Sequence, residues 1–244
     1  MFDWLKKKVH SNSESERSRQ RESEPQFKPA KLPPRRSEST QPATISPGSH
    51  AAPDSGVASG VLQDHEIFLN YLTKTFGQEE AILRHESPDG GRAVTVFVYR
   101  DIPEPGMITG VTYGLSLCDY PDWKLSRPEL IVSVPSGDTA WAFAAAYFAA
   151  EFRGQRRFCY GDVFTTDTPL ASDTQMDGFL VFAQSVVEPE KASLQLSRYK
   201  VHLSQLYPIY RSELELYGKI GLESFWKHPG FDMYDVDRKP MAAQ

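Results

Sequence analysis

Four aspartates between residues 162 and 177 are the residues of this 244-residue chain that come nearest to a metal site. Asp162, Asp167, Asp173 and Asp177 could bind a hard cation through their carboxylate oxygens. Their spacing matches no calcium-binding loop, and glycine and threonine stand between them, so we interpret the stretch as a solvated acidic turn. A hydrolase that used this turn is the weakest function that the sequence allows.

Other signs of catalysis are missing from the sequence. The chain has no GxGxxG, P-loop, HExxH, GxSxG or paired CxxC motif, and its six histidines stand at no spacing that implies metal binding or nucleophile activation. His202, between Val201 and Leu203 on an expected strand, is interpreted as solvent-facing or as part of a small hydrogen-bond network, and a catalytic base is the weaker alternative. We therefore predict no catalytic residue, no metal and no cofactor.

The loop CDYPDW, residues 118–123, is better suited to binding a protein. It places Tyr120 and Trp123 beside Asp119 and Asp122 between two expected strands. Exposed aromatic side chains supply buried area on association, and flanking carboxylates favour a basic partner. Alternatively, Trp123 folds back to cap the sheet, as loop tryptophans often do. The sequence leaves both interpretations open.

Glu213 is a carboxylate that the helical pattern places among apolar residues. We start a helix at Pro208, because the first helical turn needs no backbone donor from a proline. A rotation of 100° per residue then groups the apolar side chains on one face, namely Ile209, Tyr210, Leu214, Leu216, Tyr217 and Ile220. Glu213 falls in the middle of this face. It must reach solvent, pair with a cation or accept backbone hydrogen bonds, because a carboxylate buried alone costs several kcal/mol.

The elements that position these residues follow from hydrophobic periodicity and turn signals. The order of helices and strands predicts a single α+β domain, in which helices pack on a mixed β-sheet. Helices are expected at residues 63–76 and 139–152 and from residue 208 onward, and strands at residues 81–86, 93–100, 108–117, 130–134, 178–186 and 199–206. The apolar run 130–134 predicts a strand that is covered on both faces.

Composition divides the chain near residue 60. The first 60 residues hold eleven Ser and seven Pro with few large apolar side chains, which predicts a disordered tail, residues 1–60, before a folded domain, residues 61–244. The tail carries ten Lys or Arg against seven Asp or Glu, so the domain carries a net charge of −8 within the total of −5. Such a charge disfavours direct nucleic-acid binding and favours a basic protein partner.

Cellular location follows from the first residues, the apolar segments and the cysteines. MFDWLKKKVH lacks the pattern of a secretory signal, and its apolar and lysine residues are interpreted only secondarily as a weak anchor or docking peptide. The apolar run 139–150 is too short to span a membrane and predicts a buried helix. Cys118 and Cys159 fit no metal or redox spacing and are expected to be reduced core residues. We therefore expect a cytoplasmic protein with no membrane span.

Several segments of the chain, in this order, resemble the suppressor-of-fused domain family. They are GVTYGLS, RPELIVSVP, a GD pair followed by DTQMDGFLV, and LYPIYRSELELYGKIG. The resemblance covers most of residues 62–238. It implies an α+β domain without a known catalytic centre. It also implies that bacterial members act mainly as immunity proteins against a cognate toxin, and that animal members bind a transcription-factor peptide by strand addition.

The resemblance also marks individual residues. Glu129 matches the acid of the family's ELI pattern, and the PIY-x-x-E pattern is matched by Pro208, Ile209, Tyr210 and Glu213. We predict a structural role for Glu213, with Arg127 or Arg198 as its charge partner.

The sequence thus predicts a bacterial, non-catalytic, protein-binding module. The leading hypothesis is an immunity protein, or antitoxin, that neutralises a toxin with a basic surface, for example a nuclease. The alternative is a regulator or scaffold that captures an extended peptide by strand addition at an open sheet edge.

Overall fold

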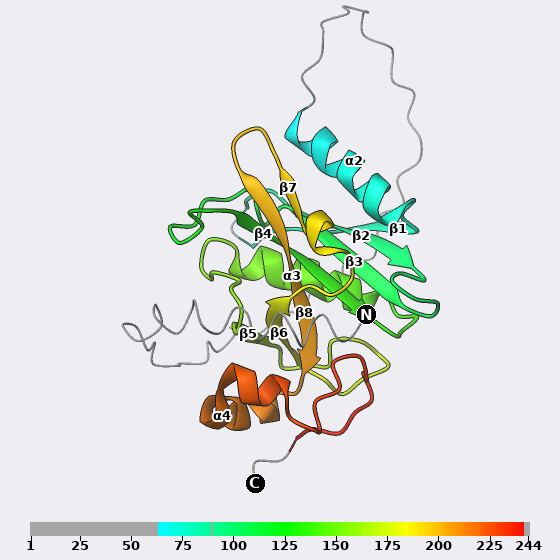
Figure 1. The fold of residues 1–244 in the computed structure, drawn as a ribbon, viewed down its shortest axis with the longest axis vertical. Helices are drawn as coiled ribbons and strands as arrows, with labels where there is room; N and C mark the ends of the chain where they lie inside the picture. The colour runs from blue at the N-terminus through cyan, green and yellow to red at the C-terminus, as the bar shows by residue number, and fades with distance from the viewer. Residues whose placement is uncertain (1–62, 89, 242–244) are drawn as a thin grey trace, which may run out of the picture.

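The computed structural model describes residues 63–88 and 90–241. The predicted tail and its first ten residues lie outside the described residues. The described part contains three α-helices and eight strands that form one mixed sheet (Figure 1). In chain order the elements are α2 Asp64–Phe76, β1 Ala81–His85, β2 Val94–Arg100, β3 Ile108–Tyr113, β4 Arg127–Val134, α3 Ala140–Phe152, β5 Val163–Thr165, β6 Gly178–Ala183, the 3-10 turn η2 Pro189–Lys191, β7 Ser193–Gln195, β8 Lys200–Ile209, the 3-10 turn η3 Arg211–Glu213 and α4 Leu214–Trp226.

The strands follow the order β1-β2-β3-β4-β8-β6-β5, and β7 pairs with β8 outside this path. The central pair, β4 and β8, is parallel, whereas the other pairs are antiparallel. Every residue of β4 from Pro128 to Val134 is buried. This confirms the prediction that the apolar run forms a strand covered on both faces. The single α+β domain with a mixed sheet is confirmed as well.

Helices cover the two faces of the sheet differently. α3 lies on one face, against alternate residues of the strands such as Val96 and Val181. α2 and α4 lie on the other face and at opposite ends of the sheet (Figure 1). Along β8, Leu203 packs in the α2 cluster and Tyr207 in the α4 cluster, and the buried polar Gln205 stands between them.

The close seating of α3 depends on small side chains. α3 carries a run of alanines, and Gly110 of β3 lies directly beneath one of them. A Cβ atom at Gly110 would come within 2.6 Å of Ala142 Cβ. This distance is far below ordinary van der Waals contact, so any larger residue at position 110 would push the helix from the sheet. As predicted, α3 is a largely buried helix.

The expected opening helix is confirmed, and it ends at Gly77 with φ of +82°. The expected strand 108–117 stops four residues early, because the amides of Gly114 and Ser116 bond to the Glu129 carboxylate and not to a neighbouring strand. The short strands β5 and β7 were not predicted.

The predicted start of the last helix is wrong. Pro208 and Ile209 belong to β8, and α4 begins at Leu214 after η3. β8 pairs with β4 only as far as Leu206. The missing amide donor of Pro208 therefore leaves no bond to β4 unmade.

The interpretation of the two cysteines as core residues is also wrong. Cys118 is half-buried and Cys159 is exposed, and both are free thiols in loops. Their apolar neighbours in the sequence had indicated strands, but Cys118 lies after the end of β3 and Cys159 before the start of β5. Within residues 63–88 and 90–241, none of the helices combines the length and apolar content needed to cross a bilayer.

Candidate protein-binding surface

The docking loop, which we define as residues 118–125, connects β3 to β4 and is fixed on one side by Trp123. The indole Nε1 of Trp123 donates a hydrogen bond to the carbonyl of Arg157 at 2.7 Å. Its ring is half-buried against the α3 core cluster and lies 5.4 Å from the ring of Tyr120. Trp123 therefore folds back toward the core and holds the loop, while part of the ring stays accessible.

Arg127 fixes the other side of the docking loop. Its guanidinium donates to the carbonyls of Ser116 and Cys118, each at 3.1 Å, and forms an ion pair with Asp119. It also lies 4.1 Å from the centroid of the Tyr199 ring. The predicted pairing of Arg127 with Glu213 is therefore wrong, because Arg127 is engaged at the far end of the sheet.

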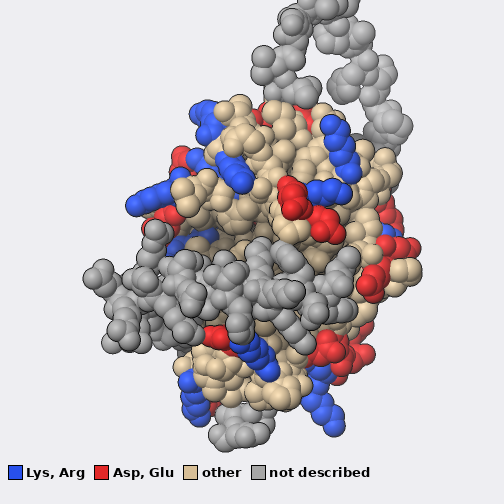
Figure 2. Space-filling view, in the orientation of Figure 1, with Lys and Arg blue, Asp and Glu red and all other residues tan. Residues whose placement is uncertain are grey.

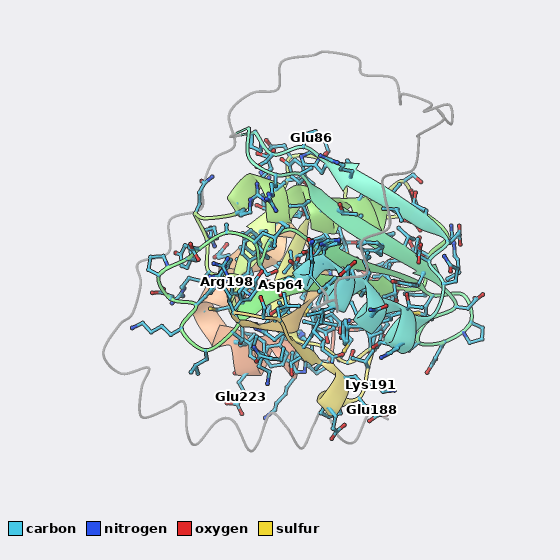
Figure 3. The ribbon with its side chains drawn as sticks, turned by 90° about the horizontal axis from the view of Figure 1, so that it is seen from above. Asp64, Glu86, Glu188, Lys191, Arg198 and Glu223 are labelled. Atoms are coloured by element: carbon cyan, nitrogen blue, oxygen red, sulfur yellow. The ribbon has the colours of Figure 1, made fainter. Side chains whose placement is uncertain are left out.

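The start of α2 adjoins this region. The amide of Ser197 donates to Asp64 at 2.7 Å, and Figure 3 shows Asp64 close to Arg198. Since Tyr199 stacks on Arg127, the tip of the β7–β8 hairpin links α2 to the docking loop.

Held in this way, the docking loop presents a side chain that the sequence analysis did not select. Leu125 is 92% exposed, the highest value among the exposed large apolar side chains of the described residues. Asp122 and Lys124 beside it are exposed as well. Together with the accessible parts of Tyr120 and Trp123, Leu125 gives the loop an apolar surface, and loops held by a rigid scaffold often carry binding contacts. The available signal was a leucine that follows two aromatic residues in the same loop.

Glu129 lies fully buried behind the same loop. Its Oε1 accepts hydrogen bonds from the Gly114 amide at 2.9 Å, the Ser116 amide at 2.9 Å and the Ser116 hydroxyl at 2.7 Å. Its Oε2 accepts one from the Thr112 hydroxyl at 2.7 Å. Burial raises the pKa of Glu129, and these four hydrogen bonds oppose that shift.

Glu213 is fully buried, as predicted, but its partner is Arg238. The Arg238 Nη1 and Nη2 atoms pair with the two carboxylate oxygens, the second at 2.8 Å, and the Met241 amide donates to Oε1 at 2.9 Å. Glu213 also accepts the Tyr210 amide at 3.0 Å. Arg198 is not its partner either. Through these bonds the Glu213 carboxylate binds the C-terminal segment, which we define as residues 231–241, to the chain just after the end of β8.

The four aspartates of residues 162–177 do not converge. Asp167 and Asp177 each bond to Arg211, whereas Asp173 accepts the Trp141 indole at 2.9 Å and Asp162 accepts the Cys159 amide at 3.0 Å. In the part of the chain that the structure describes, no three His, Cys, Asp or Glu side chains gather in a way that could hold a metal ion.

His202 is half-buried and hydrogen-bonded to one neighbour, which is closest to the interpretation as part of a small hydrogen-bond network. Its Nδ1 lies 2.8 Å from the Ser126 hydroxyl. Burial, with a further effect from Lys200, lowers the pKa of His202 to about 4. The imidazole is therefore neutral at physiological pH.

A second surface, the acidic face, is built from three segments that lie far apart in the sequence. Its exposed carboxylates are Asp101, Glu104, Glu188, Glu190, Asp232, Asp235 and Asp237. In Figure 2, red side chains lie over η2 in the upper centre, next to blue ones, and others lie along the right-hand side. None of the seven forms an ion pair with another described residue.

Tyr234 joins the three segments of the acidic face. Its hydroxyl lies 2.7 Å from that of Ser185, shortly before η2, where Figure 3 labels Glu188 and Lys191. Burial raises the pKa of Tyr234, and the charges of Glu104 and Asp232 raise it further. Glu104 and Asp232 come from two different segments, and both therefore lie close enough to Tyr234 to affect its pKa.

An eight-stranded mixed sheet with helices on both faces defines this chain as a single-domain α+β protein. Residues 90–239 match the model of the suppressor of fused protein (SUFU) family. The chain therefore belongs to this family. A search of curated proteins found no match.

Solved structures show the same fold at low sequence identity. A SUFU homolog from Neisseria gonorrhoeae is 17% identical with a TM-score of 0.56, and the match covers 74% of this chain and 98% of that chain. The Sufu protein of the Sufu–Fu complex is 14% identical with a TM-score of 0.52, covering 75% and 91%. Drosophila Suppressor of Fused is 15% identical with a TM-score of 0.51, and the match covers 72% of this chain but only 50% of that one.

Proposed function

We propose that this chain is a non-catalytic, cytoplasmic protein-binding module that acts as an immunity protein and neutralises a toxin. Family membership supports the binding role, because the Sufu protein of the same fold was solved as a complex with Fu. The immunity role follows from what the family resemblance implies for bacterial members.

The acidic face is the observation that carries the choice of a basic partner. The seven exposed carboxylates of this face outnumber the exposed Lys191 and Lys239 that lie beside them in the sequence, which favours a negative potential over this side of the domain. Such a potential attracts a basic protein and speeds its encounter, and a nuclease toxin presents basic residues where it binds its substrate.

The docking loop is the proposed contact within this interaction. Asp119 is already paired with Arg127, and Lys124 stands next to Asp122, so the loop itself has little net charge. Its contribution is apolar, through Leu125 and the accessible parts of Tyr120 and Trp123. The acidic face thus steers a basic partner, and the docking loop supplies apolar contact area.

Charge reversal tests the acidic face. The partner is first identified by affinity capture from the source cell and then purified. Glu188→Lys with Asp235→Lys should slow its association, and the effect should shrink at high salt. Glu215→Lys with Glu223→Lys is the matched control, since these two acids lie on α4 and already pair with Lys219 and Lys227. Equal effects of the two pairs would refute the proposed steering surface.

Truncation and charge reversal test the docking loop. Trp123→Ala with Asp122→Lys, or Leu125→Asp alone, should weaken binding, because loss of an anchoring side chain can remove about 2 kcal/mol of binding free energy. Ile82→Asp, at a 56% exposed residue of β1, is the control for an added surface charge. Unchanged affinity in folded loop variants would exclude the docking loop as a contact with the partner. Loss of the melting transition in Trp123→Ala would show that Trp123 is part of the core that stabilises the fold.

Neutralisation is tested separately from binding. The purified partner should arrest growth when it is expressed alone, and co-expression of this chain should restore growth. A partner that is harmless in the absence of the chain would contradict the immunity role and leave only the binding role.

The open edge at β1 supports a second candidate function, the capture of an extended peptide by strand addition. Among described strands, β1 pairs only with β2, and its Ile82 and Arg84 side chains are exposed. An added strand would bond to the free backbone groups of β1. Pro substitution at position 84 should abolish this binding and leave binding through the docking loop intact.

A further inference from the structure

Two side chains of β4, Glu129 and Arg127, bind the same short segment in complementary ways. Glu129 accepts the amides of Gly114 and Ser116, and Arg127 donates to the carbonyls of Ser116 and Cys118. These backbone groups belong to the loop base, which we define as residues 114–117, and to the first residue of the docking loop. β4 therefore sets the path of the chain as it enters the docking loop.

All four hydrogen bonds of Glu129 can be donated to an ionised carboxylate. The Thr112 oxygen accepts the Leu130 amide at 2.8 Å, so the Thr112 hydroxyl proton is free to donate to Glu129. The other three contacts of Glu129 are two amides and the Ser116 hydroxyl. A carboxylate can accept all four bonds, whereas a side chain without acceptor oxygens, such as leucine, leaves the two amides without a partner.

A buried charge of this kind is not the simplest way to stabilise a strand. Apolar residues of similar volume often stabilise a core at least as well as buried charged groups do. The four donors that Glu129 binds come from Thr112, Gly114 and Ser116, at the end of β3 and in the loop base. Gly114 has a φ of +139°, and a Cβ there would lie 3.0 Å from Val94 Cα. The carboxylate thus holds a turn that the sheet ladder does not hold.

We propose that Glu129 is a positioning residue that fixes the conformation of the docking loop and thereby presents Leu125 to the partner. The consequence for binding rests on the proposed function, but the effect on the loop does not. Without Glu129, the Gly114 and Ser116 amides lose their acceptor, and the loop base gains conformational freedom. Arg127 alone then holds the entry to the loop through carbonyls and Asp119.

The two free thiols provide a direct test. Cys118 lies at the start of the docking loop, half-buried, and the Gly154 amide bonds to its sulfur, whereas Cys159 is exposed and belongs to another segment. In the full chain under native conditions, Glu129→Leu, which removes both acceptor oxygens, should raise the alkylation rate of Cys118 by about tenfold or more relative to Cys159, because local opening frees the loop without global unfolding.

The matched control is Glu213→Leu, which alters the other buried carboxylate at the opposite end of the sheet. Both variants are compared at denaturant concentrations that give the same fraction of folded protein. A selective rise at Cys118 in Glu129→Leu alone supports the proposal. An unchanged Cys118 rate, or an equal rise in both variants, overturns it. If Glu129→Leu does not fold, Ser116→Ala removes one of the four donors and should give a smaller selective rise.

Partner affinity separates this proposal from the proposed function. If Glu129 positions a genuine contact, Glu129→Leu and Leu125→Asp should weaken binding, and the double variant should lose no more than the stronger single variant. A selective rise at Cys118 with unchanged affinity would mean that Glu129 positions the loop but that the partner binds elsewhere. That outcome would refute the loop as contact surface and leave the structural role of Glu129 standing.

Discussion

Glu213 and Arg238 form a buried ion pair, so loss of either side chain leaves the other charge buried and unpaired. Glu213 has no exposed surface and also accepts the Met241 and Tyr210 amides. Glu213→Ala leaves the Arg238 guanidinium buried without its counter-charge, so the free energy of unfolding should fall by about 3–5 kcal/mol. Glu215→Ala should leave it nearly unchanged, since Glu215 points into solvent. Urea denaturation of both variants measures the difference.

Replacement of both charged residues gives the companion test. Glu213→Leu with Arg238→Leu should be less destabilising than the sum of the single variants, because no unpaired charge remains in the core. Equal midpoints for Glu213→Ala and Glu215→Ala, or additive losses in the double variant, would contradict the pairing.

His202 makes stability depend on pH. Its pKa is about 4 in the folded protein, against 6.5 for an ordinary histidine. The unfolded state therefore binds a proton first as the pH falls, so the free energy of unfolding should decrease between about pH 6.5 and pH 4. In His202→Gln this part of the decrease should be absent. Denaturation curves at pH 5 and pH 8 measure it, and an identical pH dependence of both proteins would show that His202 is not responsible.

At the scale of elements, the C-terminal segment is as much a part of the fold as the helices are. Phe231 and Met241 pack in the α4 cluster, whereas Val236 reaches the α3 cluster on the other face. The Val236 carbonyl accepts the Thr174 hydroxyl at 2.7 Å, and the Arg238 carbonyl accepts the Tyr210 hydroxyl at 2.6 Å. This segment therefore ties α4, β8 and the 166–177 loop together.

Truncation after residue 230 should lower the melting temperature strongly, because it removes three buried apolar side chains and the partner of Glu213. Removal of residues 242–244 alone is the control and should have little effect. Glu213→Leu introduced into the truncated chain should recover part of the loss, since it removes the carboxylate left unpaired. A truncated chain with the melting temperature of the full chain would show that the segment contributes no stability.

At the scale of the whole molecule, charge and composition separate the first 60 residues from the domain. The tail carries a net charge of +3 and the domain −8. We predict that removal of residues 1–58 leaves the melting temperature nearly unchanged, because so few large apolar residues contribute little buried area. Calorimetry of both chains tests this. A protease-resistant fragment that begins well before residue 50 would contradict it.

The sequence alone determined the features that local patterns encode. The 3.6-residue periodicity and Gly77 defined α2, and the apolar run of β4 predicted a strand covered on both faces. The excess of acids in the domain predicted a negative surface. The helix wheel also placed Glu213 in the core, although Pro208 and Ile209 belong to a strand. In each case a short stretch contains the information, because periodicity and turn chemistry act between residues a few positions apart.

Only the tertiary structure decided which distant residues meet. Arg238 and not Arg127 or Arg198 neutralises Glu213, because the chain returns to the end of β8 after α4. Glu129 accepts hydrogen bonds from the amides of the turn that follows β3. The acidic face consists of residues from three segments that lie far apart in the sequence. Leu125 stands exposed because Trp123 and Arg127 hold the loop around it. Such contacts depend on the order of the strands in the sheet and on where the chain runs after α4. Packing between distant residues decides both, and short-range sequence patterns do not encode them.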